Sequence, residues 1–407
     1  MKKDSFAPKV SVIIATGNCA DNNHAAHMEE CLDSVLGQSL REIEVIVADI
    51  GSDDRTRGMR EMRGILERYA ESDERVRLIR MLSDAHGSRG HAKNLALDKA
   101  YATFFIIVEP CDCLKENALE VLHGQLQEKP ELDLVKGFIE GFGEGVNTSI
   151  IRPDGGAGHG EGKSSAMARW MMFGCAGMYR RSLVERMNIR HYDKPGYGNQ
   201  NIMMDFLGFA YSESLLVSDA VYRRRLGIEG QEGQPVTDPK AVYDICAEYR
   251  ALEERLRGAR KGFELKGAEL ELARKSELKS GRRGSQDKWI QYRYAFWQSY
   301  FQSNLEMYER LANELKPKLS ARMYDDIRAA MRRGDFDREH FDASARELLE
   351  LLLDSPKEFG EEMGRQQWER EIDRARILVK LDREEAAKKE AARRWEQARE
   401  ISRAGQG

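Results

Sequence analysis

The stretch PKVSVIIATGN, residues 8–18, decides the fold of this chain. Its apolar run Val10–Ile14 is short and rich in β-branched residues, which predicts a strand buried on both faces. The run ends in Thr16-Gly17-Asn18, small and polar residues of the kind that follow a strand. Apolar residues then recur at helical spacing: Met28, Cys31, Leu32, Val35 and Leu36. The opening therefore predicts a strand followed by a helix.

The same alternation continues over the next hundred residues or so. The further strands are predicted at Ile43–Ala48, Val76–Met81 and Phe104–Val108. The helices between and after them are predicted at 59–69, His91–Ala100 and Asn117–Leu126. This order predicts an α/β fold, a mostly parallel sheet flanked by helices.

The pattern is less regular over residues 134–226. The further elements expected there are Leu134–Phe138, Met171–Arg181, Ile202–Ala210 and Leu215–Tyr222. Residues 153–164 (PDGGAGHGEGKS) are rich in glycine and predict a loop rather than a phosphate-binding turn, because no strand clearly precedes them. We assign residues 1–230 to this first domain.

Beyond the linker Gly227–Pro239 an all-α region is predicted, a helical domain over 231–360. A charged helix is expected over about 240–279, an aromatic-rich helix from Trp289 to about Leu315, and shorter helices after Pro317. The tail, 361–407, mixes charges of both signs and predicts a solvated amphipathic helix, with a coiled coil and partner binding as the sharper alternative.

Composition limits the functional classes. The chain has 407 residues, 41% of them hydrophobic, and a net charge of −4, which gives no electrostatic reason to expect nucleic acid as a partner. Its six cysteines are scattered, as in a reduced, cytoplasmic protein. The apolar runs are short, so we expect no signal peptide and no membrane-spanning helix.

Polar residues follow all four predicted strands, at the edge where open parallel sheets bind ligands. The segments are Thr16–Asn18, Asp49–Asp54, Asp84–Gly87 and Glu109–Asp112. The carboxylates of Glu109 and Asp112 suit Mg²⁺ or Mn²⁺ shared with a phosphate. The alternative is that these two acids cap the next helix, and the pattern alone leaves both open.

Several motifs in order resemble glycosyltransferase family 2. They are VSVIIATGN, then EECLDSVLGQSLREIEVIVADIGSDDRT, HAKNLALDKA, FFIIVEPCDCL, LDLVKGF, GCAGMYRRSLVERMNI, PGYGNQNIMMDF and VYRRR, over residues 8–226. The resemblance is to a branch with an EPDD-like metal segment and a C-terminal helical extension. It implies a GT-A fold, a nucleoside-diphosphate sugar donor and, usually, inversion at the anomeric carbon.

The resemblance also implies site residues. Asn18 and Asp49 line the nucleoside site, and Thr16 ends the same first strand. Lys93 and Asn94 stand where the family has an Arg-Asn pair. Glu109 and Asp112 belong to the metal-binding segment, and Asn201 stands where the family often has its catalytic aspartate.

Four positions depart from the family pattern. Lys93 replaces the arginine of the Arg-Asn pair and keeps its charge but loses the bidentate fork. Ile50 replaces an acid that often recognises the base, Cys111 replaces an acid of the metal segment, and Asn201 replaces the base. A carboxamide does not accept the acceptor's proton, and loss of a general base costs about 10²–10⁴-fold in rate. Asp205 follows one helical turn later and is a substitute candidate, against the plainer interpretation of a surface or helix-end residue.

Other clusters have plainer explanations. A zinc site at Cys111 and Cys113, joined by His86 and His91, lacks a second ligand pair at suitable spacing. The aromatic residues of 289–301, with Lys288 and Arg293 beside them, could stack nucleotides. We favour the core of the helical domain for them.

The sequence thus predicts a metal-dependent glycosyltransferase that moves a sugar from a nucleoside diphosphate to a cell-surface glycan or its lipid-linked precursor. The alternative is a catalytically silent GT-A domain that binds a partner. We expect a cytoplasmic protein, with peripheral association at the inner face of the plasma membrane and self-association through the C-terminal helices as further expectations.

Overall fold

The computed structural model describes most of the chain. The described residues are 7–17, 23–50, 57–81, 89–143, 149–151, 175–193, 212, 214–226, 236–243, 246–255, 285–334, 336, 338, 341, 343–367 and 369. Among these residues, none of the helices combines the length and the apolar character needed to cross a bilayer.

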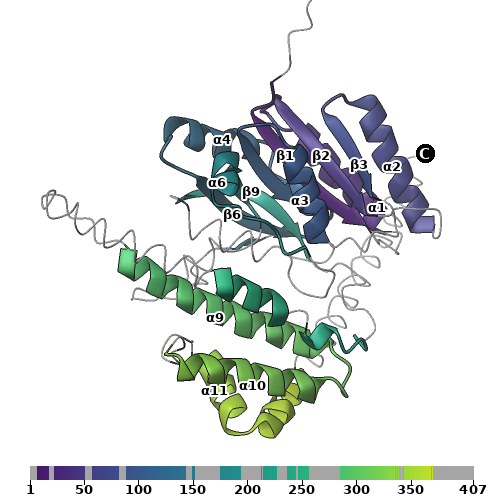
Figure 1. The fold of residues 1–407 in the computed structure, drawn as a ribbon. Helices are drawn as coiled ribbons and strands as arrows, with labels where there is room; N and C mark the ends of the chain where they lie inside the picture. The colour runs from purple at the N-terminus through teal and green to yellow at the C-terminus, as the bar shows by residue number, and fades with distance from the viewer. Residues whose placement is uncertain are drawn as a thin grey trace, which may run out of the picture.

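Four parallel strands form the first half of the sheet: β1 (Val10–Gly17), β2 (Ile43–Ile50), β3 (Val76–Met81) and β4 (Phe104–Val108). β1 lies between β2 and β4. β3 flanks β2 on its other side (Figure 1). Every residue of β4, and all but the last of β2, is buried, which explains why these strands are continuously apolar. All four predicted strands are therefore confirmed.

The second half of the sheet is mixed. It contains β5 (Cys113–Leu114), β6 (Leu134–Phe142), β7 (Ser149–Ile151), β8 (Gly177–Arg180) and β9 (Ser214–Arg225). The strand order is β3-β2-β1-β4-β8-β6-β9-β5, with β7 on β6. β8 runs antiparallel to β4 and β6, whereas β9 runs parallel to β6. The predicted α/β sheet is confirmed, with antiparallel β8 inserted at its centre.

Helices cover both faces of the sheet (Figure 1). Successive side chains of a strand point to opposite faces, so Val12 and Ile14 belong to one core and Ile13 and Ala15 to the other. The first core contains side chains of α1 (Asn23–Leu36), α2 (Arg57–Ser72) and α4 (Ala118–Glu128). The second contains those of α3 (Arg89–Lys99) and α6 (Arg181–Arg186).

The region after the sheet is helical, as predicted. It contains α9 (Ser285–Arg310), α10 (Lys316–Arg332) and α11 (Ala343–Asp354), with further helical residues at 246–255 and 356–367. The aromatic-rich α9 ends at Arg310 rather than near Leu315. Val236 explains the difference, because its N–H donates to the Arg310 carbonyl (2.8 Å) and its carbonyl accepts from Ala312 (2.9 Å).

One hydrophobic core joins the sheet to the helical region. Buried side chains of β1, β4 and α3 belong to the same cluster as those of helix 246–255, α9 and α10. A polar contact adds to this junction: the guanidinium of Arg255 donates to the carbonyls of Met187 (3.4 Å) and Asn188 (3.0 Å), just after α6. The helical region therefore packs on the face of the sheet that α3 and α6 also cover.

Several predicted features lie outside the described residues. They are the Gly-rich stretch 153–164, the element at 202–210, residues 256–279 of the charged helix, and the tail from 370 onward.

Candidate functional site

The candidate site lies at the carboxyl ends of β1, β2 and β4. Parallel pairing of β1 and β2 sets Thr16 opposite Asp49. Both are buried, Thr16 at 1% exposure and Asp49 at 2%, although each is polar. A buried carboxylate needs partners, so these positions are held by interactions rather than left to solvent. Two of the predicted donor-site residues therefore lie side by side.

The segment after β4 turns back at once. The Asp112 N–H donates to the Glu109 carbonyl (3.0 Å), and Cys113 then begins β5. The thiol of Cys31, on α1, donates to the same carbonyl (3.6 Å). Glu109, Cys111 and Asp112 thus form one short turn at the edge of the sheet, where the sequence predicted a metal segment.

Lys93 of α3 pairs with Glu109. Its ammonium group donates to Oε1 of the carboxylate, with 3% of the Lys93 side chain and 26% of the Glu109 side chain exposed. Burying an unpaired ammonium would be costly, so this carboxylate stabilises the buried lysine. The predicted cation and one predicted metal ligand are therefore in direct contact.

Asp112 is held by two donors from β9. The Tyr222 hydroxyl donates to Oδ2 (2.8 Å), and the Arg225 backbone N–H donates to Oδ1 (2.9 Å). Burial raises the pKa of Asp112 to about 6, although these two hydrogen bonds favour its charged form. Asp112 is therefore a desolvated carboxylate kept in one orientation.

Asn94 follows Lys93 in α3 but serves another segment. Its amide nitrogen donates to the His191 carbonyl (3.0 Å), and its amide oxygen accepts from the His191 N–H (2.9 Å). The two bonds resemble the paired backbone hydrogen bonds between neighbouring β-strands. They fix the backbone at His191, in the segment that follows α6. Both ends of the Asn94 amide are occupied by backbone, so the structure shows Asn94 holding a neighbouring segment.

Two carboxylates fit a hard divalent ion only in part. Within the described part of the chain, no group of three or more His, Cys, Asp or Glu side chains is arranged to hold a metal. Mg²⁺ nevertheless often takes one or two carboxylates and completes its shell with water and substrate phosphates. Each carboxylate oxygen of Asp112 accepts one of the two hydrogen bonds from β9, and a carboxylate oxygen has a second lone pair with which to bind a metal. Glu109 and Asp112 thus suit a metal that arrives with its phosphate ligand.

The departures from the family pattern have different surroundings. Ile50, the last residue of β2, is partly buried and packs against the hydrophobic core. The carbonyl of Cys111 accepts a hydrogen bond from Nε of Arg225 (3.0 Å), and Cys111 is partly exposed. Asn18, Asn201, Asp205 and His86 lie outside the described residues.

The sequence-based site missed Tyr222 and Arg225. Both belong to VYRRR, a motif that supports the family resemblance but carries no obvious chemistry of its own. Tyr222 is 0% exposed, and its hydroxyl donates a hydrogen bond to the carboxylate of Asp112. The VYRRR motif therefore belongs to the site.

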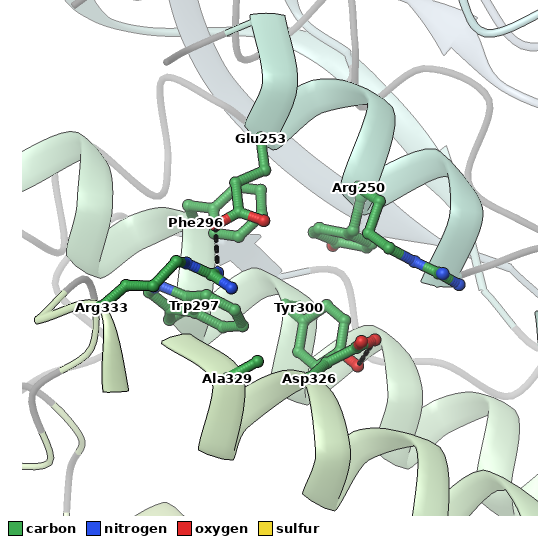
Figure 2. A pocket seen from close by; sticks show the side chains of 9 residues that line it. Arg250, Glu253, Phe296, Trp297, Tyr300, Asp326, Ala329 and Arg333 are labelled. Atoms are coloured by element: carbon green, nitrogen blue, oxygen red, sulfur yellow. Dashed lines mark hydrogen bonds and ion pairs between the residues drawn. The ribbon is translucent and has the colours of Figure 1, made fainter. Parts of the chain in front are cut away.

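A separate cavity lies in the helical region. Its volume is about 80 Å³, and Figure 2 shows Trp297, Tyr300 and Ala329 around it, with the Arg333–Glu253 ion pair at one side. A pocket of this volume is large enough to hold ordered water molecules. The aromatic side chains around it are buried and pack edge to face, Trp297 against both Phe296 and Tyr300. The structure thus favours the core interpretation of the aromatic cluster.

The fold has known counterparts. A crystal structure of S. aureus TarS, residues 1–349, in complex with UDP-GlcNAc matches 88% of this chain and 92% of that one, with a TM-score of 0.57 and 16% identity. At this identity the likeness concerns the fold. The mixed sheet with carboxylates beyond its parallel strands, followed by helices, is thus a GT-A domain with a helical extension.

Sequence similarity identifies the family of the first domain. Residues 11–187 match the model described as Glycosyl transferase family 2, so the domain that carries the site belongs to this family.

Two curated relatives agree with this assignment. "Glycosyltransferase GlyG" of Streptococcus pneumoniae is 31% identical over 122 residues, which is 30% of this chain and 38% of that protein. The "GalNAc(5)-diNAcBac-PP-undecaprenol beta-1,3-glucosyltransferase" of Campylobacter jejuni is 24% identical over 204 residues, 47% of this chain and 57% of that protein. The chain therefore spans roughly two fifths to three fifths of these relatives' lengths.

Proposed function

We propose that this protein transfers a sugar from a nucleoside diphosphate to a hydroxyl of a cell-envelope glycan or its lipid-linked precursor. The observation that carries the proposal is the placement of Glu109 and Asp112 in one ordered turn, beyond the parallel strands of a family 2 domain. The Campylobacter relative is named for transfer to an undecaprenol-linked acceptor, and the TarS structure contains a UDP-sugar. Both support the donor and acceptor classes proposed here.

We propose Mg²⁺ or Mn²⁺ as the cofactor, held by Glu109 and Asp112 together with the donor's phosphates. Such an ion supplies positive charge that stabilises the departing diphosphate. The chain's own part is to hold these carboxylates. Lys93 fixes Glu109 from α3, and β9 fixes Asp112 from the opposite side.

Donor binding is proposed for the neighbouring polar groups. Asp49, beside Thr16, lies at the same edge of the sheet and suits the nucleoside. Because Ile50 is apolar, it offers no hydrogen bond to a base, so base selectivity weaker than that of a two-acid site is expected.

The proton acceptor is proposed from sequence. An inverting transfer needs a base for the acceptor hydroxyl, and Asn201 does not titrate usefully. We propose Asp205 for this role. Asp205→Asn should lower turnover by about 10²-fold or more, whereas Asn201→Asp should raise it if the family position is still aligned with the acceptor.

The deciding experiment is calorimetry of the full chain with UDP, GDP, CDP and dTDP, each with and without Mn²⁺. At least one nucleoside diphosphate should bind in a metal-dependent manner, and Asp112→Asn should abolish the metal dependence. If no nucleoside diphosphate binds, and the protein neither hydrolyses any nucleotide sugar nor transfers a sugar from one, the transferase proposal is wrong.

A silent binding domain is the second candidate. The altered positions Ile50, Cys111 and Asn201 favour it. Turnover that falls sharply in Asp112→Ala would exclude it, because a scaffold has no turnover to lose.

A further inference from the structure

Strand β9 reaches the candidate site from the second half of the sheet. It pairs antiparallel with the short β5, setting Cys113 opposite Arg223 and Leu114 opposite Tyr222. β5 begins immediately after Asp112. The strand that ends in VYRRR is therefore the direct neighbour of the turn that carries the two carboxylates.

One hydroxyl connects both carboxylate-bearing residues. The Tyr222 hydroxyl accepts from the backbone N–H of Glu109 (3.1 Å) and donates to Oδ2 of Asp112 (2.8 Å). Tyr222 is fully buried, so its hydroxyl is shielded from solvent and held between these two partners.

Arg225 holds the same turn by a second route. Its backbone N–H donates to Oδ1 of Asp112 (2.9 Å), and its Nε donates to the Cys111 carbonyl (3.0 Å). Its guanidinium also pairs with Glu30 of α1 and lies 4.4 Å from the centre of the Phe142 ring. With 11% of its side chain exposed, Arg225 is fixed by all these partners.

We propose that Tyr222 is a positioning residue that orients Glu109 and Asp112 toward the diphosphate of the donor, with Arg225 as its partner. This inference rests on the proposed function, since it names what holds the donor-binding carboxylates. Residues that orient metal-binding carboxylates affect affinity or activity by about 10–100-fold when they are replaced. Tyr222 touches neither the donor nor a reacting atom in this role, so it acts through the turn.

Removal of one hydroxyl tests the proposal. Tyr222→Phe keeps the ring and its packing but leaves the Glu109 N–H and Asp112 Oδ2 without this partner. The matched control is Tyr249→Phe in the helical region. Tyr249 is equally buried, and its hydroxyl also has two partners, Ser299 (2.8 Å) and Ser303 (2.9 Å).

Two measurements on the full chain separate local order from function. Hydrogen exchange followed by mass spectrometry reports the order of residues 109–114 without any ligand. Calorimetry with Mn²⁺ and the nucleoside diphosphate that binds best in the panel of four reports the function. We expect Tyr222→Phe to speed exchange in residues 109–114 and to weaken Mn²⁺-dependent binding about tenfold or more, and Tyr249→Phe to do neither.

Each other outcome is decisive. Unchanged exchange at 109–114, or faster exchange with unchanged affinity, overturns the positioning role. If wild-type protein binds no nucleoside diphosphate, the proposed function fails and the role in donor binding fails with it, whereas the exchange result still reports on the turn.

If Tyr222→Phe does not fold, Arg225→Lys replaces it, because lysine lacks the Nε donor to Cys111. Weaker binding in that variant supports the proposal, and unchanged binding overturns it.

Discussion

At the scale of single residues, two ion pairs of different depth allow a direct comparison. The ammonium of Lys93 is buried against Glu109, whereas Lys115, with 36% of its side chain exposed, pairs with Glu140. Lys93→Met should lower the free energy of unfolding by about 1–3 kcal/mol, because it leaves a partly buried carboxylate without its cation. Lys115→Met should cost less than about 1 kcal/mol, because Lys115 is more exposed and Arg223 still pairs with Glu140 (3.2 Å). Urea denaturation at neutral pH measures both, and equal losses would contradict the prediction.

Asp326 of α10 gives a prediction about pH. Burial raises the pKa of its carboxyl, although the Tyr300 hydroxyl donates to it (2.9 Å; Figure 2). The folded protein therefore holds this proton more tightly than the unfolded chain does, and the stability it contributes is lost as the pH rises through the raised pKa.

The side chain of Asp326→Asn cannot ionise. The free energy of unfolding of this variant should therefore increase relative to that of the wild type as the pH rises from about 4 to about 7. Urea denaturation across this range measures the difference in free energy of unfolding. Asp354→Asn, on the exposed end of α11, serves as the control. A difference that stays constant with pH, or moves in favour of the wild type, would contradict the expected sign.

The residue scale also shows what the sequence could predict. Thr16, Asp49, Glu109 and Asp112 were placed at strand ends because apolar runs define strands and polar residues follow them. Tyr222 was not placed there, because 110 residues separate it from Asp112. No local pattern encodes a hydrogen bond over such a distance along the chain.

At the scale of elements, two glycines differ in what a methyl group would meet. A Cβ on Gly137 of β6 would lie 2.6 Å from a Val221 methyl and 2.8 Å from the Asp219 carbonyl, where β6 and β9 change register. Gly137→Ala should therefore destabilise the protein by about 1–3 kcal/mol. Gly124→Ala, with open space around it in helix α4, should stabilise by about 0.5–1 kcal/mol. Thermal unfolding measures both, and shifts of the same sign would refute the argument.

Element type was predictable where apolar runs were long and buried. The parallel strands and the helices between them follow from periodicity, because each must cover the other. The antiparallel direction of β8 was not predictable, because it depends on pairing with β4 and β6 rather than on any local preference. The early end of α9 has a similar cause, since Val236 competes for its last carbonyl.

At the scale of the whole molecule, the shared core implies that the sheet and the helical region unfold together. Leu252 is fully buried in this core, and Arg255 of the same helix contacts the chain after α6. Leu252→Ala should lower the free energy of unfolding by about 2–5 kcal/mol and shift one calorimetric transition to lower temperature. Two separated transitions, in the wild type or in the variant, would show that the parts are independent.

The sequence predicted the helical region but not its union with the sheet. Aromatic spacing in α9 indicated a buried face without showing what covers it, because an amphipathic stripe does not specify its partner. In the structure, the buried face of α9 packs against the face of the sheet that α3 and α6 also cover.

The bonds from β9 to the carboxylate turn also determine when the site is completed during synthesis. Tyr222 and Arg225 join residues made 110 and 113 positions earlier, and Arg225 pairs with Glu30 across 195 positions. A ribosome-bound chain that has emerged only to residue 221 contains every carboxylate of the turn but none of these donors. Contacts of such long separation form slowly. The emerging polypeptide is therefore expected to complete the proposed donor site only after β9 has left the exit tunnel, so a chain released before this point would lack the bonds that hold the carboxylate turn, even with residues 1–200 complete.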